Sequence, residues 1–198
     1  MKPIRVKLAV LPVLALLGAL VAGAPAASAQ PAPVRAEPSY QTWIADIEKV
    51  TGPANTYLDE RLAKPGGKPA LVFDIDNTTL ETHYHFDLVT IPAIPPMLAL
   101  AKRAKEHGAA IFFVTGRPDI LRDLTASNLA RVGYPVDGLF LRPTLSTEPL
   151  NVPKTRSRAE IEKNGYTIVA NLGNSATDLV GGHAERTFKL PDYDGLLD

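Results

Sequence analysis

The sequence predicts a three-layer α/β domain, in which a parallel β-sheet lies between two layers of helices in the manner of a Rossmann-like fold. One observation is a set of short runs that are apolar on both faces, such as Ala70–Phe73 and Ala109–Val114. Helical stretches separate these runs, so consecutive strands have the long connections that parallel pairing requires. The chain of 198 residues contains no cysteine. Its core must therefore form without disulfides, and thiolate metal sites and cysteine catalysis are excluded.

The N-terminal part of the chain is expected to lie outside this domain. Three basic residues precede an apolar run over residues 8–21, and small residues follow as far as Ala29. This arrangement is typical of a secretory signal peptide over residues 1–29, and the run is shorter than the roughly 20 residues of a membrane span. The proline-rich residues 30–38 predict a flexible leader. We therefore expect a secreted protein, with no membrane attachment after cleavage, whose single domain is residues 39–198.

The charge of the mature chain excludes some classes of partner. Without residues 1–29, 18 basic residues face 21 acidic ones, which gives a net charge of −3. A slightly acidic domain lacks the positive surface that binds nucleic acid or anionic membranes. We expect a small-molecule partner, and the sequence leaves the oligomeric state open.

Two amphipathic helices come first and are expected to cover the domain. Ser39 is a suitable N-cap, and apolar residues recur at helical spacing over residues 40–50. Gly52-Pro53 is expected to break this helix. A second helix then carries Tyr57, Leu58 and Leu62, and it ends before a Pro-Gly-Gly turn.

Strands and helices alternate along the rest of the chain. Glycines at positions 108, 133 and 165 are typical of helix C-termini. The expected strands are 70–73, 109–114, 139–141, 166–172 and 187–190, and the expected helices are 96–107, 118–132 and 154–164.

Polar residues begin where the apolar runs stop. Taken singly, each has an ordinary interpretation as a turn former, a helix cap or a solvated lysine. In a parallel sheet, however, the carboxyl ends of neighbouring strands meet at one edge, where ligands bind. The prediction of a site rests on this convergence, and the residues concerned are Asp74, Asp76, Thr115, Gly116, Lys154, Asn174 and Asp178.

These residues resemble the motifs of the haloacid dehalogenase-like (HAD) phosphohydrolase superfamily. Its Asp-x-Asp-x-Thr motif is matched by Asp74-x-Asp76-x-Thr78, its Thr or Ser by Thr115 and its lysine by Lys154. Its Gly-Asp-x-x-x-Asp motif is matched by Gly173-Asn174-x-x-x-Asp178, with Asn in place of the first Asp.

A narrower resemblance covers residues 154–191. It is to the secreted acid phosphatase branch that contains class B acid phosphatases and plant vegetative storage proteins. The matching residues are Lys154, Arg158, Gly165-Tyr166, Asn171, Gly173, Thr177-Asp178-Leu179 and Phe188-Lys189-Leu190-Pro191.

The resemblance implies a HAD fold with a minimal cap, and a phosphatase that hydrolyses phosphomonoesters through an aspartyl-phosphate on Asp74. Asp76 would protonate the leaving oxygen and then activate water. Phosphoryl oxygens would be bound by Thr115 and by backbone N–H groups of Ile75, Asp76 and Gly116, and Lys154 would neutralise developing charge. Mg²⁺ would be the cofactor, with ligands drawn from Asp74, the Asp76 carbonyl, Asn174 and, directly or through water, Asp178.

Several alternatives stay open from the sequence. The neutral Asn174 is compatible with a storage or binding protein of the same fold that has weak or lost turnover, and a phosphotransferase is a further possibility. Tyr84 and Phe86 either contact the leaving group or pack elsewhere. His83 and His85 could share a zinc ion on a strand, but a pocket wall is favoured because no third ligand is near. For Arg117, Arg142 and Arg158, the sequence does not distinguish contact with phosphate from pairing with acidic neighbours.

Overall fold

The computed structural model describes residues 36–197 apart from positions 65, 86 and 88. The predicted signal peptide, most of the predicted leader and Phe86 lie outside the described residues. Within the described part of the chain, no helix has both the length and the apolar character that crossing a membrane requires.

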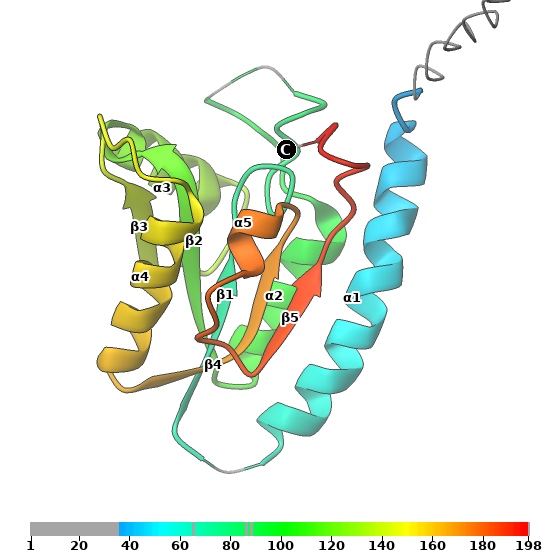
Figure 1. The fold of residues 1–198 in the computed structure, drawn as a ribbon. Helices are drawn as coiled ribbons and strands as arrows, with labels where there is room; N and C mark the ends of the chain where they lie inside the picture. Colours follow the sequence, from blue (N-terminus) through cyan, green and yellow to red (C-terminus); the bar gives the residue numbers. More distant parts are fainter. Residues whose placement is uncertain (1–35, 65, 86, 88, 198) are drawn as a thin grey trace, which may run out of the picture. The chain divides into compact units, whose positions relative to one another are not determined.

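Five parallel strands form one sheet in the order β3–β2–β1–β4–β5 (Figure 1). The central strand, β1, pairs with β2 on one side and β4 on the other, so Val72 lies opposite both Phe112 and Asn171. The chain moves outward from β1 to β3 and then returns to the other side of β1. This reversal creates a crevice at the carboxyl ends of β1 and β4. The strands are β1 (Lys68–Phe73), β2 (Ala110–Pro118), β3 (Gly138–Arg142), β4 (Tyr166–Gly173) and β5 (Arg186–Lys189).

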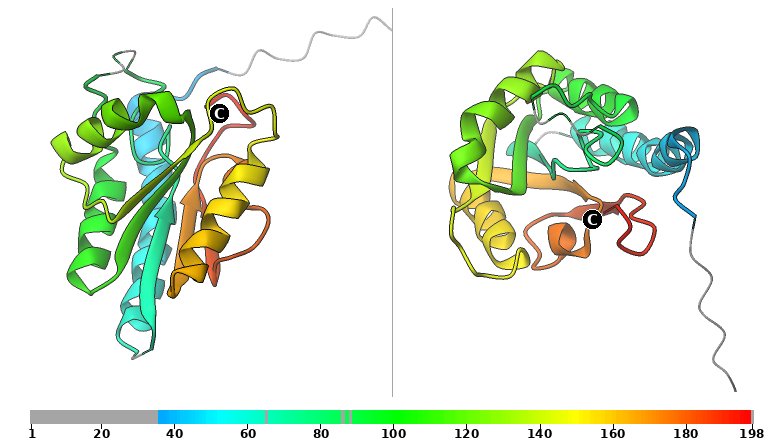
Figure 2. Two further views of the ribbon diagram at one scale, coloured as in Figure 1. Left: turned by 90° about the vertical axis from the view of Figure 1, so that its left-hand side faces the viewer. Right: turned by 90° about the horizontal axis from the view of Figure 1, so that it is seen from above.

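Helices cover both faces of the sheet (Figure 2). One layer contains α1 (Tyr40–Leu62), α2 (Pro95–Glu106) and α3 (Arg122–Arg131), and the other contains α4 (Asn151–Lys163) and α5 (Ala176–Leu179). Successive strand residues point to opposite faces. Leu71 and Phe73 therefore join the larger core under the first layer, while Ala70 and Val72 join a smaller core under α4. The predicted three-layer parallel α/β fold is confirmed.

The predicted break at Gly52-Pro53 is wrong, because α1 runs without interruption from Tyr40 to Leu62. A proline inside a helix costs about 3 kcal/mol, since it removes one backbone hydrogen bond and crowds the preceding turn. The buried residues Trp43, Ile47 and Leu58 lie on one face along the whole helix. Burying each such side chain contributes roughly 1.5–3 kcal/mol, which exceeds the cost of the proline.

The predicted helix over residues 118–132 starts later than expected. Strand β2 continues to Pro118, which is extended and pairs with Arg142 of β3. A 3₁₀ turn over Asp119–Leu121 follows, and α3 begins at Arg122. Helix α4 instead begins three residues earlier than predicted, which places Lys154 in its first turn.

Candidate active site

A cavity of about 490 Å³ opens at the carboxyl ends of the strands. It brings together residues that directly follow β1 and β4 with residues of β2, α4 and α5, as the convergence argument predicted. Two of its lining residues, Arg142 and Leu150, come from the end of β3 and from the loop before α4. The lining residues are Asp74, Asp76, Gly116, Arg117, Arg142, Leu150, Lys154, Asn174, Ser175, Thr177 and Asp178.

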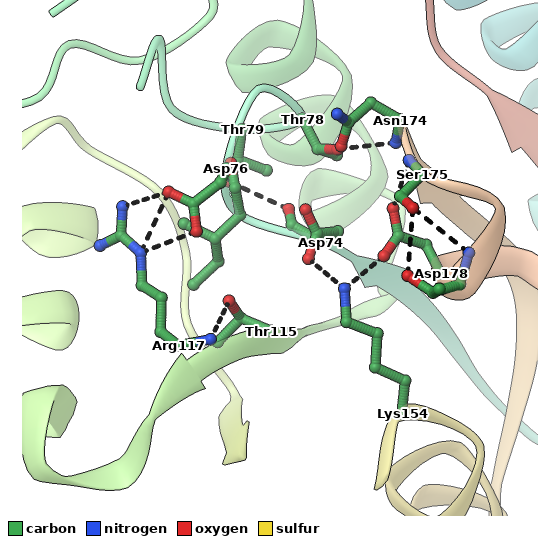
Figure 3. Close-up of polar contacts among 12 residues, drawn as sticks. Asp74, Asp76, Thr78, Thr79, Thr115, Arg117, Lys154, Asn174, Ser175 and Asp178 are labelled. Carbon is green, nitrogen blue, oxygen red and sulfur yellow. Dashed lines mark hydrogen bonds and ion pairs between the residues drawn. The ribbon is translucent and has the colours of Figure 1, made fainter. Parts of the chain in front are cut away.

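Lys154 forms a buried ionic bridge between Asp74 and Asp178 (Figure 3). Its Nζ donates to Asp74 Oδ1 at 2.8 Å and also to Asp178 Oδ1. The other oxygen of Asp178 accepts the backbone N–H of Ser175 at 2.8 Å and so caps α5. Both oxygens of Asp178 are thus engaged, which favours a role as the counter-ion of Lys154 over a role as a metal ligand.

Burial sets the charge states in this bridge. It raises the pKa of Asp74 to about 7, with the carboxylates of Asp178 and Asp76 adding to the shift and Lys154 opposing it. Burial also disfavours the charge on Lys154, but Asp74 and Asp178 outweigh this effect and hold the pKa of Lys154 above its ordinary value. Lys154 is therefore an ammonium ion throughout the physiological pH range.

Asp76 is held by a forked ion pair with Arg117. The guanidinium donates from Nη2 to Oδ1 at 2.6 Å and from Nε to Oδ2 at 3.0 Å, and Thr82 Oγ1 donates to Oδ1 at 2.7 Å. Burial alone would raise the pKa of Asp76, but the bonds from Arg117 and Thr82 hold it below its ordinary value. Asp76 is thus a carboxylate. The sequence left open whether Arg117 pairs with an acidic neighbour, and in the structure it pairs with Asp76.

Asn174 forms three hydrogen bonds to two neighbours. Its Oδ1 accepts from Thr78 Oγ1 at 3.0 Å, and its backbone N–H donates to the same hydroxyl at 3.0 Å. Its Nδ2 donates to the carbonyl of Leu197 at 2.8 Å. The preceding residue, Gly173, cannot be replaced by a residue with a side chain, because a Cβ there would overlap the side chain of Asp178.

Thr115 is buried within β2, three residues before the end of the strand, and its hydroxyl accepts the backbone N–H of Arg117 at 3.1 Å. The adjacent Gly116 lines the cavity. The side chain of Ile75 is buried in the large core, so only its backbone is available to a ligand.

Tyr84 lies outside the lining of the cavity. Its ring contacts Tyr40 and Trp43, and its hydroxyl donates to the carbonyl of Pro38 at 2.7 Å. This loop therefore packs against the start of α1.

The two histidines of this region have separate partners. His83 bonds Glu37 at 2.7 Å and His85 bonds Glu81 at 2.9 Å. No group of three or more His, Asp or Glu suited to a metal occurs among residues 36–197 as described.

Arg158 is fully buried on α4, four residues after Lys154. It donates to the backbone carbonyls of Asp178, Val180 and Gly182. This side chain holds the end of α5 and thereby the backbone of Asp178, and phosphate contact is not its role in this geometry.

The oxygen donors at the cavity fit a hard cation with few protein ligands. They are the carboxylate of Asp74, the backbone carbonyl of Asp76 and the amide oxygen of Asn174, and all three residues line the cavity. Mg²⁺ is bound through one or two carboxylates together with substrate phosphate and water. With Asp74 as its single carboxylate, this set of donors has the smallest number of carboxylates that such a Mg²⁺ site uses.

Comparisons with known proteins identify the family to which the chain belongs. Residues 86–196 match the family described as HAD superfamily, subfamily IIIB (acid phosphatase). Acid phosphatase 1 of Solanum lycopersicum is 28% identical over 169 residues, covering 74% of this chain and 66% of that protein. The Stem 28 kDa glycoprotein of Glycine max is 36% identical over 106 residues, covering 51% and 42%. Vegetative storage protein 1 of Arabidopsis thaliana is 34% identical over 102 residues, covering 51% and 38%.

The matches span less than half the length of the stem glycoprotein and of the storage protein. Among solved structures, the class C acid phosphatase from Bacillus anthracis aligns with a TM-score of 0.61 at 23% identity, covering 72% of this chain and 68% of that one. This likeness supports the fold. The family match covers more than half of the sequence, and the chain therefore belongs to the acid phosphatase subfamily IIIB of the HAD superfamily.

Proposed function

We propose that this protein is an acid phosphatase that hydrolyses phosphomonoesters through an aspartyl-phosphate on Asp74, with Mg²⁺ as cofactor. The observation that carries the proposal is the position of Asp74. It lies at the end of the central strand in a cavity lined by the cations of Lys154, Arg117 and Arg142. A carboxylate among cations can receive an anionic phosphoryl group, because the cations offset the mutual repulsion.

In the first step, a carboxylate oxygen of Asp74 attacks phosphorus, and the bond from phosphorus to the leaving oxygen breaks. Asp76 supplies the proton that the leaving oxygen takes up. In the second step, water attacks the aspartyl-phosphate and gives its proton to Asp76. Inorganic phosphate leaves, and the Asp74 carboxylate is restored.

Arg117 links substrate binding to the protonation of Asp76. Its fork holds Asp76 ionised in the free site, whereas the first step needs the protonated acid. A phosphoryl group competes for the same guanidinium. When Arg117 turns to the phosphoryl oxygens, the pKa of Asp76 rises and the acid form becomes accessible.

Bound Mg²⁺ would supply positive charge beside the Asp74 carboxylate and the phosphoryl oxygens. Asp74, the Asp76 carbonyl and Asn174 would hold it. Lys154 neutralises charge at Asp74 Oδ1, and its ammonium is also held by Asp178.

The test is hydrolysis of nitrophenyl phosphate with and without Mg²⁺, in the unaltered protein and in Asp74→Asn. The matched control is Asp123→Asn, an exposed carboxylate on α3. Asp74→Asn should abolish turnover, because an amide is a poor nucleophile. The nucleophile assignment fails if this variant keeps activity within about tenfold of the unaltered protein.

A second candidate function is a storage or binding protein with weak turnover. The neutral amide of Asn174 at the metal position favours it. No Mg²⁺-dependent activity on any phosphomonoester, together with retained phosphate binding, would select this function. A phosphotransferase would instead give a phosphorylated alcohol when a nucleoside is added to the assay.

Export to the extracellular space completes the proposal. The exported protein is expected to begin at Gln30, since Ala27 and Ala29 are the small residues that a signal peptidase requires. The mass of the exported material measures this directly, and an intact Met1 in the membrane fraction would contradict it.

A further inference from the structure

The C-terminal segment, residues 191–197, ends against the loop that follows the nucleophile. The side chain of Leu197 is fully buried in the large core, 0% exposed. Its backbone carbonyl accepts two side-chain amides, from Asn77 at 2.7 Å and from Asn174 at 2.8 Å. Both asparagines are buried, at 6% and 3% exposed, so this junction is largely shielded from bulk water.

The orientation of the Asn174 amide is fixed by Leu197. Thr78 Oγ1 accepts the backbone N–H of Asn174, so its own hydrogen is free to be donated to Asn174 Oδ1. The carbonyl of Leu197 can only accept, and it therefore requires the Nδ2 end. Reversing the amide would break the bond to Leu197 and place two oxygens against each other, and an unsatisfied buried polar group costs roughly 1–3 kcal/mol.

Asn77 is fixed in the same way. Its Oδ1 accepts the backbone N–H of His83 at 2.7 Å, while its Nδ2 donates to Leu197. Its backbone adopts the left-handed conformation, with φ of 54°, which asparagine tolerates better than most residues. The two amides thus hold the same carbonyl from the loops after β1 and β4.

We infer that Leu197 and Asn77 are positioning residues of the phosphoryl site, because the Leu197 carbonyl fixes Asn174 with its amide oxygen as the end that remains available to a cation. An amide binds a metal ion only through its oxygen, and Thr78 uses one of the two lone pairs of that oxygen. The inference rests on the proposed function, since Asn174 is there a ligand of Mg²⁺.

This arrangement also explains why position 174 has an amide. A carboxylate there has no hydrogen to donate, and it would place a charged oxygen against the carbonyl oxygen of Leu197. Asn174→Asp should therefore have two opposite effects. It adds a full charge that binds Mg²⁺ more tightly, and it releases the C-terminal segment.

Hydrogen exchange measured by mass spectrometry tests whether Asn77 and Asn174 hold the C-terminal segment through the Leu197 carbonyl. It is measured on the C-terminal peptide of the full-length protein, with a metal chelator present. The variants are Asn174→Asp and Asn77→Asp, and the latter keeps the oxygen that accepts from His83. Each should lower the protection of the C-terminal peptide by about tenfold or more. The control, Asn164→Asp, makes the same chemical change at an exposed position after α4 and should leave protection unaltered. Unaltered protection in Asn174→Asp overturns the inference.

Calorimetric titration with Mg²⁺ alone separates positioning from mere structure. Asn77→Asp places an added negative charge near the site, so electrostatics alone predicts tighter binding. The positioning role predicts weaker binding by about threefold or more, because one of the two donors that hold Leu197 is lost. Tighter or equal binding overturns the positioning role. If the unaltered protein binds no Mg²⁺, the assignment of Mg²⁺ as cofactor in the proposed function fails. The exchange experiment then still decides whether the two asparagines hold the C-terminal segment.

Discussion

Replacing Lys154 by methionine tests how the buried bridge of the site is balanced. Methionine has a similar length and no charge, so the change removes the cation with little loss of packing. It leaves Asp74, 6% exposed, and Asp178, 3% exposed, without their common partner. Removing one partner of a buried ion pair costs about 3–5 kcal/mol, because the remaining charge is unpaired.

The expected loss in thermal stability follows from this cost. Each kcal/mol lowers the melting temperature by about 2–4 °C for a domain of this size, so Lys154→Met should lower it by about 6–20 °C at pH 8. The loss should be smaller at pH 5. Burial has raised the folded-state pKa of Asp74 from 3.8 to about 7, and without Lys154 this pKa rises further. A carboxyl group with a raised pKa costs stability increasingly as the pH rises from its unfolded value through its folded value.

The assay is differential scanning calorimetry at pH 5 and pH 8 with a chelator present. Lys163→Met, an exposed lysine at the end of the same helix, is the control and should change little. The double variant Lys154→Met with Asp178→Asn should recover part of the loss at pH 8, because it removes one of the two unpaired charges. A melting temperature within about 2 °C of the unaltered protein at pH 8, or an equal loss at both pH values, would refute the reasoning.

Three further changes test the rest of the site. Asp76→Ala should slow hydrolysis by about 10²–10⁴-fold for an alkyl phosphate and less for nitrophenyl phosphate, whose leaving oxygen needs no proton; equal losses would contradict the acid role. Arg117→Met should raise KM and move the alkaline limb of the kcat/KM profile, which reports the free enzyme, to higher pH, because the pKa of Asp76 is no longer held down there; an unmoved limb would argue against the coupling. Gly173→Ala should lower both melting temperature and activity, whereas Gly52→Ala, inside α1 with open space at its Cβ, should stabilise the protein by up to about 1 kcal/mol.

The sheet could be predicted because its strands are apolar on both faces. Glycine and polar residues mark the ends of these runs, so the order and the limits of the strands can be read from the sequence. The position of the site followed from the same pattern, since Asp74 and Asn174 come directly after strands that proved to be neighbours. Convergence at one sheet edge needs only the fold class and the order of the strands.

The contacts between side chains could not be predicted in this way. Local sequence at Gly52-Pro53 indicates a break, and only packing along α1 overrides it. The partner of Arg117 is 41 residues earlier in the chain, and the partner of Asn77 is 120 residues later. Pairing over such separations depends on loop geometry, which no periodicity encodes.

The charges around the cavity account for the neutral residue at position 174. Among the described residues that line it, the cations of Arg117, Arg142 and Lys154 equal in number the carboxylates of Asp74, Asp76 and Asp178. When all six groups are ionised, the site is therefore balanced before substrate arrives. A phosphomonoester dianion would add two negative charges and Mg²⁺ would add two positive ones, so the two ligands restore the balance only together. Each must then raise the affinity for the other. A carboxylate at position 174 would weaken this dependence, because the site would then hold the cation more tightly in the absence of phosphate.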